Sequence, residues 1–500
     1  MSKSVIRVSL LLAVVTLILA LAPLWAGRSD LRLIGEIMAY LALAVLWNLL
    51  AGYAGLMSVG QQAFVGLGGY MLMISTVMLG LPPLAALPLA FVLAGGQGAR
   101  LYPLTAERCK PAVPFGARYR IVDFVLSNLI NSNIRAVYLL VQYKPQSLIE
   151  HIRKAWEISP LLPDQFVTVV PPQMDAHTQG FRGTADAVYQ SLQLIQLHRP
   201  DLVAVFGADH IYRMDIGQMA LFHREHGADV TISALPVPIT QASSFGIIDA
   251  DAAGRIRAFQ EKPAQPLPMP GDPTRAYASM GNYLFDTRVL VQALIEAHER
   301  GETDFGAHVL PRLLHTHTLY AYDFTRNAVP GLKAYEERGY WRDVGTIDAY
   351  FESHADVLGE EPRFDAFNPQ WPIFSSNYQG PVARILGGDI DNSLFGAASM
   401  VCRGARVHGS IIRREAVVES GAELEDCVVM DYGRIGAGSK LRRVIIDRHN
   451  AIPPGTVIGY DPEEDRRRYH VTPGGVVVIP RGDVCYFARD SRGQGPGYAE

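Results

Sequence analysis

The sequence predicts an α/β domain with an open, largely parallel sheet, followed by a parallel β-helix and preceded by membrane-spanning helices. Three observations lead to this prediction. Between about residues 89 and 350, short apolar runs alternate with amphipathic stretches, which is typical of a sheet covered by helices. Apolar residues recur with a fixed period in the last third of the chain. From Leu33 to Ala99 the only charged side chain is Glu36.

Length and composition limit the classes of protein to consider. A chain of 500 residues is long enough for two to four domains, and a net charge of −4 gives no argument for a nucleic-acid partner. The cysteines lack the paired spacing of a disulfide framework or a zinc site, so a reducing compartment fits best. They are Cys109, Cys402, Cys427 and Cys485.

The amino-terminal segment contains three apolar runs. Val8–Ala26 and Leu33–Tyr53 are long enough to cross a hydrocarbon core of roughly 30 Å, whereas Phe64–Leu81 is marginal in length. A cleaved signal peptide is the alternative for the first run, although that run is longer than a usual signal core. Lys3 and Arg7 favour a cytoplasmic amino terminus.

Topology decides between two and three spans. Two spans return the chain to the cytoplasm, whereas three would place the following domain outside, where its cysteines could oxidise. We therefore expect two true spans in the inner or plasma membrane, with 56–81 in the interface or re-entrant, and a cytoplasmic domain after them.

One part of this segment has a recognisable pattern. The stretch NLLAGYAGLMSVGQQAFVGLGGY (48–70) resembles branched-chain amino acid ABC transporter permeases in the spacing of its Gly, Ser, Gln and aromatic residues. The resemblance covers only residues 5 to 90, so it implies a permease-like domain over 1–88 and no working permease. A genuine fusion and a rearranged or mis-assembled gene both account for the join.

A glycine-rich turn follows directly. The apolar run Leu89–Ala94 has the pattern of a buried strand, and Gly95, Gly96 and Gly98 come after it. A strand followed by such a turn brings backbone N–H groups close to phosphates, because no Cβ blocks the approach. A simple tight turn is the alternative. Charge for a polyphosphate is available from Arg100, Arg108 and Lys110.

This stretch, GGQGARLYPLTAERCKP (95–111), resembles the signature of sugar nucleotidyltransferases. The next, KPAVPFGARYRIVDFVLSNLINSNI (110–134), narrows the resemblance to glucose-1-phosphate adenylyltransferases. Further motifs extend it to about residue 485: FRGTADAV (181–188), GADHIYRMD (207–215), FGII (245–248), FQEKPA (259–264), YASMGNYLFD (277–286) and YWRDVGT (340–346).

The resemblance implies a Rossmann-like nucleotidyltransferase domain over 89–370 and a left-handed parallel β-helix domain over 371–500, in a homotetramer. It implies that ATP and glucose 1-phosphate give ADP-glucose and pyrophosphate with Mg²⁺, for glycogen or a related α-glucan. Two alternatives are a sugar nucleotidyltransferase that uses UTP or dTTP, and a permease remnant whose cytosolic part is not catalytic.

The resemblance also implies site residues. Arg100, Lys110, Asp209 and Asp343 would be catalytic, with the two aspartates holding the magnesium ion. The three glycines of the turn would cradle the triphosphate. Glucose 1-phosphate would contact Phe181, Gly246, Glu261, Lys262 and Ser279. From the residues alone, Asp209 after the apolar run of VAVFGADH is better explained by a helix N-cap.

Regulation is implied by basic positions. Arg108, Arg120 and Arg448 match effector-site positions of the family and favour an anionic metabolite effector. Glu107 stands where enterobacterial relatives carry the Lys that contacts a phosphorylated activator. Because a carboxylate repels phosphate, we expect fructose 1,6-bisphosphate to activate weakly.

The carboxyl-terminal repeat needs no family knowledge. Twelve apolar positions form four sets of three, spaced by six within a set, and each set starts seventeen residues after the last. Three inward residues per coil indicate a parallel β-helix, whereas antiparallel strands need not keep a period. The sets are Phe395, Val401, Val407; Ile412, Val418, Leu424; Val429, Ile435, Leu441; and Ile446, Ile452, Ile458.

Overall fold

The computed structural model describes residues 89–482 apart from 97, 157–164, 174–179 and 270. All of these belong to one compact unit, which begins at Ala85. The expected permease-like segment 1–88, with its apolar runs, lies outside the described residues. Among the described residues, no helix combines the length and the apolar character that a membrane crossing requires.

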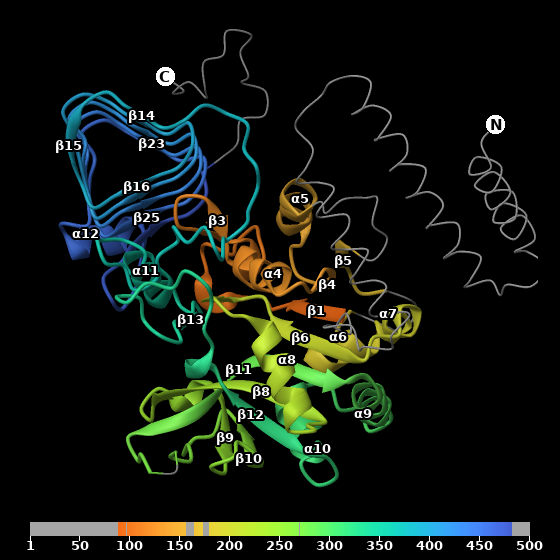
Figure 1. Ribbon diagram of the computed structural model, residues 1–500. Coiled ribbons are helices and arrows are strands. Elements are labelled where there is room, and N and C mark those ends of the chain that lie inside the picture. The colour runs from red at the N-terminus through yellow and green to blue at the C-terminus, as the bar shows by residue number, and fades with distance from the viewer. Residues whose placement is uncertain (1–88, 97, 157–164, 174–179, 270, 483–500) are drawn as a thin grey trace, which may run out of the picture. The chain divides into compact units, whose positions relative to one another are not determined.

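The amino-terminal part of the described chain is built on one large sheet in the order β10-β9-β11-β6-β1-β4-β5 (Figure 1). The parallel strands are β1 (Leu89–Ala94), β4 (Ala136–Val141), β5 (Phe166–Val170) and β6 (Leu202–Gly207). The expectation of a largely parallel sheet holds for this half. The other half is antiparallel except for β12 on β8: β8 (Val230–Pro238), β9 (Gly246–Ala250), β10 (Ile256–Glu261), β11 (Arg275–Asp286) and β12 (Leu319–Asp323).

Strand β1 lies at the centre of the parallel half and is buried on both faces. Ala90 and Val92 pack into one hydrophobic cluster, and Leu89 and Phe91 pack into the other. Alternate residues of a strand point to opposite faces, so a fully apolar run fits a strand covered on both sides. The apolarity of Leu89–Ala94 is therefore that of a sheet interior.

Helices cover each face of this sheet. Residues of α4 (Ile121–Asn131), α5 (Gln146–Ala155) and α8 (Ile216–Glu225) belong to the first cluster. The second cluster contains residues of α6 (Thr184–Tyr189), α7 (Leu192–His198), α9 (Thr287–Glu299) and α10 (Leu310–Leu313). Two helices, α11 (Ile347–Ala355) and α12 (Pro462–Arg468), follow later in the chain.

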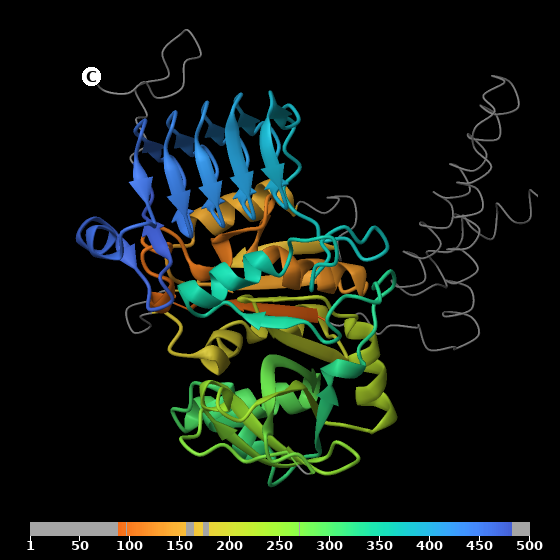
Figure 2. The ribbon, with the colours of Figure 1, turned by 90° about the vertical axis from the view of Figure 1, so that its left-hand side faces the viewer.

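The carboxyl-terminal part is a parallel β-helix whose coils stack in Figure 2. All twelve predicted inward positions align in register, and the eleven after Phe395 are buried in one cluster, which confirms the repeat. The first wall is β14 (Arg384–Ile385), β17 (Met400–Val401), β20 (Val417–Val418), β23 (Arg434–Ile435) and β26 (Ala451–Ile452). The second is β15 (Gly388–Asp391), β18 (Ala405–His408), β21 (Glu423–Glu425), β24 (Lys440–Arg442) and β27 (Val457–Ile458). The third is β16 (Leu394–Phe395), β19 (Ile411–Ile412), β22 (Val428–Val429), β25 (Val444–Ile446) and β29 (Val477–Ile479), with β28 (His470–Val471) antiparallel to β29.

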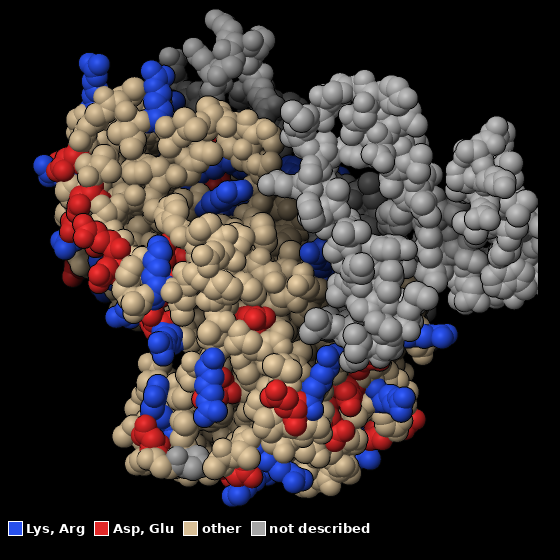
Figure 3. Space-filling model, viewed as in Figure 1, with Lys and Arg blue, Asp and Glu red and all other residues tan. Residues whose placement is uncertain are grey.

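The corners of the coils use an uncommon backbone conformation. Three columns of residues, each spaced by seventeen, have positive φ: Asn392, Gly409, Asp426 and Arg443; Ala398, Glu415, Tyr432 and His449; and Gly404, Gly421, Gly438 and Gly455. The third column is all glycine, whereas only one of the eight residues in the first two is, so packing of the coils overrides the local preference of the other seven. Acidic and basic side chains are interspersed along the outer edge of the β-helix (Figure 3), where Arg406 pairs with both Asp389 and Glu423.

The outer face of the third wall packs against the sheet domain. Ile411, Val428, Ile445 and Val478 are neighbours in register. We call these four residues the junction row. They share a buried cluster with Phe115 and Phe124 of the first part and with Tyr350 of α11. The two parts of the described chain therefore meet through an apolar interface.

Candidate active site

A cavity of about 700 Å³ opens at the carboxyl ends of β1, β4 and β6. This is the edge where open α/β sheets bind ligands. The cavity brings together every residue that was assigned to catalysis, to the triphosphate or to the sugar phosphate. They are Gly95, Gly96, Gly98, Arg100, Lys110, Phe181, Asp209, Gly246, Glu261, Lys262, Ser279 and Asp343.

The glycines of the turn after β1 differ in what the protein itself requires. Gly98 has φ of 64°, and a Cβ there would lie 3.1 Å from a side-chain carbon of Thr105 and 3.2 Å from Cβ of Lys110. The Thr105 hydroxyl also donates to the Gly98 carbonyl at 2.9 Å. Among the described residues, a Cβ at Gly96 would meet nothing within 4 Å. Space over Gly96 is therefore available to a ligand.

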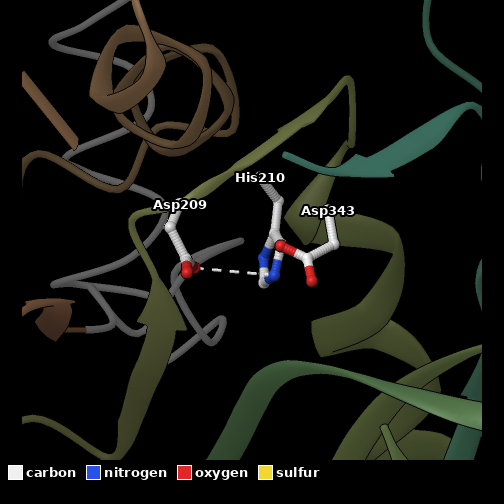
Figure 4. A group of neighbouring side chains, drawn as sticks. All are labelled: Asp209, His210 and Asp343. Carbon is white, nitrogen blue, oxygen red and sulfur yellow. Dashed lines mark ion pairs between the residues drawn. The ribbon is translucent and has the colours of Figure 1, made fainter. Parts of the chain in front are cut away.

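Two acidic residues converge because two short strands pair. Asp209 lies between β6 and β7 (His210–Tyr212), and Asp343 ends β13 (Trp341–Asp343). In the antiparallel ribbon of β7 and β13, Asp343 is opposite His210. Figure 4 shows the Asp209, His210 and Asp343 side chains together, with ligand atoms all within 4.8 Å of one another. Carboxylate oxygens so arranged suit a hard divalent cation.

Lys110 binds both carboxylates. Its Nζ lies 2.9 Å from Oδ2 of Asp209 and 3.0 Å from Oδ1 of Asp343. Burial alone would lower the pKa of Lys110, but the two carboxylates outweigh burial and raise it. Burial likewise opposes ionisation of Asp209, yet His210 and Lys110 hold the pKa of that carboxyl well below its usual range. Lys110 and Asp209 are therefore both ionised at neutral pH.

The sugar-phosphate side of the cavity is arranged around Glu261. A Cβ at Gly306 would lie 2.4 Å from Oε2 of Glu261, and a Cβ at Gly246 would lie 3.1 Å from the same oxygen. The carboxylate of Glu261 thus occupies space that two glycines leave open. Oε1 of Glu261 is 3.0 Å from Nζ of Lys262, whose ammonium end is solvent-exposed.

Local backbone geometry positions the neighbouring residues. Lys262 has φ of 46°, a left-handed conformation that is uncommon for lysine, and its N–H donates to the Phe245 carbonyl at 3.1 Å. Such strain is frequent at ligand-binding positions. The N–H of Phe181 donates to Oε1 of Gln142 at 3.1 Å, and the Ser279 hydroxyl accepts from the N–H of Gly281 at 3.2 Å.

Several residues of the cavity were not predicted from the sequence. His210 and Trp341 stand inside motifs that the resemblance singled out, and their rings pack at 4.8 Å. Gln142, Asp304 and Gly306 also line the cavity. Asp304 accepts hydrogen bonds from the Ala307 N–H at 3.0 Å and from the Thr184 hydroxyl at 2.9 Å. The sequence TDFG, an N-cap residue followed by a glycine, was the available signal for these last two.

The three arginines expected at an effector site lie away from the cavity, at the junction with the β-helix. Arg108 donates to both carboxylate oxygens of Asp447, at 2.8 and 2.7 Å. Arg120 donates to the carbonyl and hydroxyl of Ser147 at 2.9 and 3.0 Å. Burial, together with repulsion from Arg108 and Arg120, lowers the pKa of Arg448 to about 10. The three arginines are therefore neighbours, although the charge of Arg108 is already paired.

Two family models match the chain. The Nucleotidyl transferase model matches residues 89–360, and the model described as GlmU-like, C-terminal hexapeptide matches residues 383–479. The two matched regions correspond to the sheet domain and to the coils of the β-helix.

Proteins of similar sequence match most of the chain. A protein of Thermodesulfovibrio yellowstonii is 54% identical over 394 residues, which are 79% of this chain and 96% of the relative. One of Thermus thermophilus is 48% identical over 409 residues, and one of Anaeromyxobacter sp. is 46% identical over 405 residues. Each of these two matches covers 79% of this chain and 98% of the relative. All three relatives are named glucose-1-phosphate adenylyltransferase.

Proposed function

The chain belongs to the glucose-1-phosphate adenylyltransferase family, and we propose that it converts ATP and glucose 1-phosphate into ADP-glucose and pyrophosphate. One observation carries the proposal. A single cavity holds the glycine-rich turn, the pair Asp209 and Asp343 with Lys110 between them, and the Glu261–Lys262 pair.

The reaction needs orientation and charge neutralisation more than covalent help. A phosphate oxygen of glucose 1-phosphate attacks the α-phosphorus of ATP in line, the bond to the β-phosphate oxygen breaks, and pyrophosphate leaves. Asp209 and Asp343 offer converging carboxylate oxygens, which fit Mg²⁺. When bound, the ion would neutralise phosphate charge.

Other residues of the cavity bind the phosphates and the sugar. Arg100 and Lys110 stabilise the charge that builds on the α-phosphate and on the departing pyrophosphate. Backbone N–H groups of Gly95 and Gly96 bind the triphosphate, because no side chain covers them. Lys262 binds the phosphate of glucose 1-phosphate, while Glu261 accepts hydrogen bonds from sugar hydroxyls.

Several finer assignments accompany this proposal. We assign residues 89–370 to the catalytic domain, 371–500 to a left-handed β-helix domain, and 1–88 to a permease-like membrane segment. The enzyme is a homotetramer whose catalytic domain works in the cytoplasm and supplies glycogen or a related α-glucan. An anionic metabolite regulates it at Arg120 and Arg448, beside Arg108, which was also expected to bind the effector but whose guanidinium is bound to Asp447. The buried Nε of Arg448 has no partner among the described residues, which supports a ligand there.

Nucleotide choice tests the activity. The full chain, and a version beginning near Pro83, are supplied with glucose 1-phosphate, Mg²⁺ and ATP, UTP or dTTP in parallel. We expect ADP-glucose to form with the highest kcat/KM. A better reaction with UTP or dTTP would show that the adenylyl assignment is wrong.

Cell fractionation tests the membrane segment. The full chain should sediment with membranes, and the version from Pro83 should stay in the supernatant. Protease added to intact cells should leave the catalytic domain uncut. Cleavage from outside would contradict the two-span topology.

A further inference from the structure

Lys110 differs from the other cationic side chains of the cavity. Arg100 is exposed, and the side chains of Arg182 and Lys262 are 52% and 65% exposed. The Lys110 side chain is only 9% exposed and bonds to two carboxylates at once. Lys110 is therefore buried against the two aspartates, whereas the other cations of the cavity are exposed to solvent.

Lys110 takes up one oxygen of each carboxylate that could hold a divalent cation. Oδ2 of Asp209 and Oδ1 of Asp343 each accept from the Lys110 ammonium. A metal ion held by the same two carboxylates, with the ammonium in its present place, would put three positive charges within a few ångströms. Like charges at that separation repel strongly where water is scarce. The ammonium and the metal ion therefore weaken each other's binding.

Only the side chain of Lys110 is free to move. Its backbone begins the short helical turn Lys110–Ala112, all three residues of which are buried. Two residues earlier, Arg108 is held by the buried bond to Asp447. The lysine stem is flexible and the cavity is open, so the ammonium has room to move toward a triphosphate bound in the cavity.

We propose that Lys110 and the divalent cation compete for Asp209 and Asp343, and that the triphosphate settles the competition by drawing the Lys110 ammonium onto its own oxygens. The inference rests on the proposed function, because it takes the nucleotide and metal of that reaction as the ligands. Movement of the Lys110 ammonium from the aspartates to the triphosphate frees the carboxylates for the metal ion and adds a cation to the triphosphate. Binding of either ligand therefore strengthens binding of the other. The coupling is reciprocal, as linkage demands, and a factor of roughly 5 to 150 is typical of such couplings.

Direct metal binding tests this competition without turnover. Mn²⁺ is titrated into the full chain with no nucleotide, and free Mn²⁺ is followed by electron paramagnetic resonance. We expect Lys110→Met to bind Mn²⁺ at least about tenfold more tightly than the unaltered protein. Lys262→Met is the matched control, because it removes the same charge from the same cavity without touching Asp209 or Asp343. Equal affinity in the unaltered protein and Lys110→Met, or an equal gain in both variants, would overturn the proposal.

Pyrophosphate supplies the second arm. Added to the unaltered protein, it should tighten Mn²⁺ binding through direct ligation and through removal of Lys110. In Lys110→Met pyrophosphate can act only by ligating Mn²⁺ directly, so it should increase the Mn²⁺ affinity by a smaller factor than in the unaltered protein. An enhancement of the same size in both proteins would contradict the proposed coupling.

A third measurement needs no variant. Acetic anhydride labels lysine amines, and peptide mass spectrometry reports the extent at each position. Mn²⁺ alone should increase labelling of Lys110 in the unaltered chain, with the exposed Lys144 as the internal reference. Unchanged or reduced labelling of Lys110 would overturn the proposal. Because none of these measurements involves catalysis, a protein that shows the competition yet makes no ADP-glucose would contradict the proposed function alone.

Discussion

Arg108 and Lys110 are two residues apart, and both bind carboxylates, yet they belong to different environments. Arg108 and Asp447 are each 1% exposed and lie where the catalytic part meets the β-helix. Lys110 is 9% exposed, while its partners Asp209 and Asp343 are 39% and 21% exposed to the cavity. The role of each ion pair therefore follows from whether water and ligands can reach it. The buried pair is fixed, and the pair at the cavity can exchange its cation.

The junction has further bonds that keep it closed. Nε of Arg413 lies 3.0 Å from Asp431, and its guanidinium also donates to the backbone carbonyls of Phe115 and Gly116. With the junction row packed beside them, these groups are shielded from water. Removing one partner from such a pair leaves a charge that water cannot reach. Four substitutions sharpen this contrast.

The largest effect is expected at the cavity. Asp209→Asn keeps the shape of the side chain but removes the charge that would hold a metal ion and balance Lys110. We expect kcat to fall by roughly 10²- to 10³-fold, with little change in the free energy of unfolding, because Asp209 is partly exposed. Steady-state kinetics and urea unfolding measure the two quantities. A kcat within threefold of the unaltered protein would remove Asp209 from the mechanism.

The second-largest effect is expected at the junction, where a substitution should lower the free energy of unfolding. Asp447→Asn leaves the buried guanidinium of Arg108 without its counter-charge, which costs about 3–5 kcal/mol. Glu425→Gln is the control, because its pair with Arg442 lies on the surface, with both side chains 49% exposed, and is worth about 0–1 kcal/mol. Urea unfolding of both variants compares the losses. Similar losses would mean that burial does not distinguish these pairs.

A smaller effect separates the two halves of the cavity. In Gly306→Ala the new Cβ would lie 2.4 Å from Oε2 of Glu261, so the carboxylate must move. We expect kcat/KM for glucose 1-phosphate to fall roughly 10- to 100-fold, since small misplacements of a positioned group are costly, while KM for ATP stays the same. Gly96→Ala should show the opposite pattern. Equal effects on both substrates in either variant would contradict the division.

The smallest effect is expected outside both ion-pair clusters. Glu107 pairs with Arg481 at the protein surface, so Glu107→Lys should change the free energy of unfolding by less than about 1 kcal/mol. It should nevertheless strengthen activation by fructose 1,6-bisphosphate, because a repulsive carboxylate becomes a cation. Activation curves measure this, and an unchanged curve would place the effector elsewhere.

The sequence predicted features that local geometry dictates. The seventeen-residue period identified the inner wall of the β-helix, because each coil must return an apolar residue to the same place. The turn after Leu89–Ala94 was identified because an apolar strand pattern is followed directly by glycines. The junction row escaped notice, since residues such as Ile411 and Val428 are explained only by the domain that covers them.

Features that depend on distant pairing were reached only through the family resemblance or were missed. Asp343 meets Asp209 through the register of β7 with β13, which no local pattern shows. The partner of Arg108 is 339 residues away, so the sequence could suggest an effector site but could not show a buried pair. Gly306, in the helical turn after Asp304, leaves room for the carboxylate of Glu261 at the end of β10.

The contrast between the two ion pairs can be seen directly in a crystal structure of the full chain with Mg²⁺ and a non-hydrolysable ATP analogue. We predict that Nζ of Lys110 leaves Asp209 and Asp343 and lies against phosphate oxygens, while Arg108 still binds both oxygens of Asp447. A structure in which Lys110 remains between the two aspartates, or in which Arg108 has left Asp447, would contradict it.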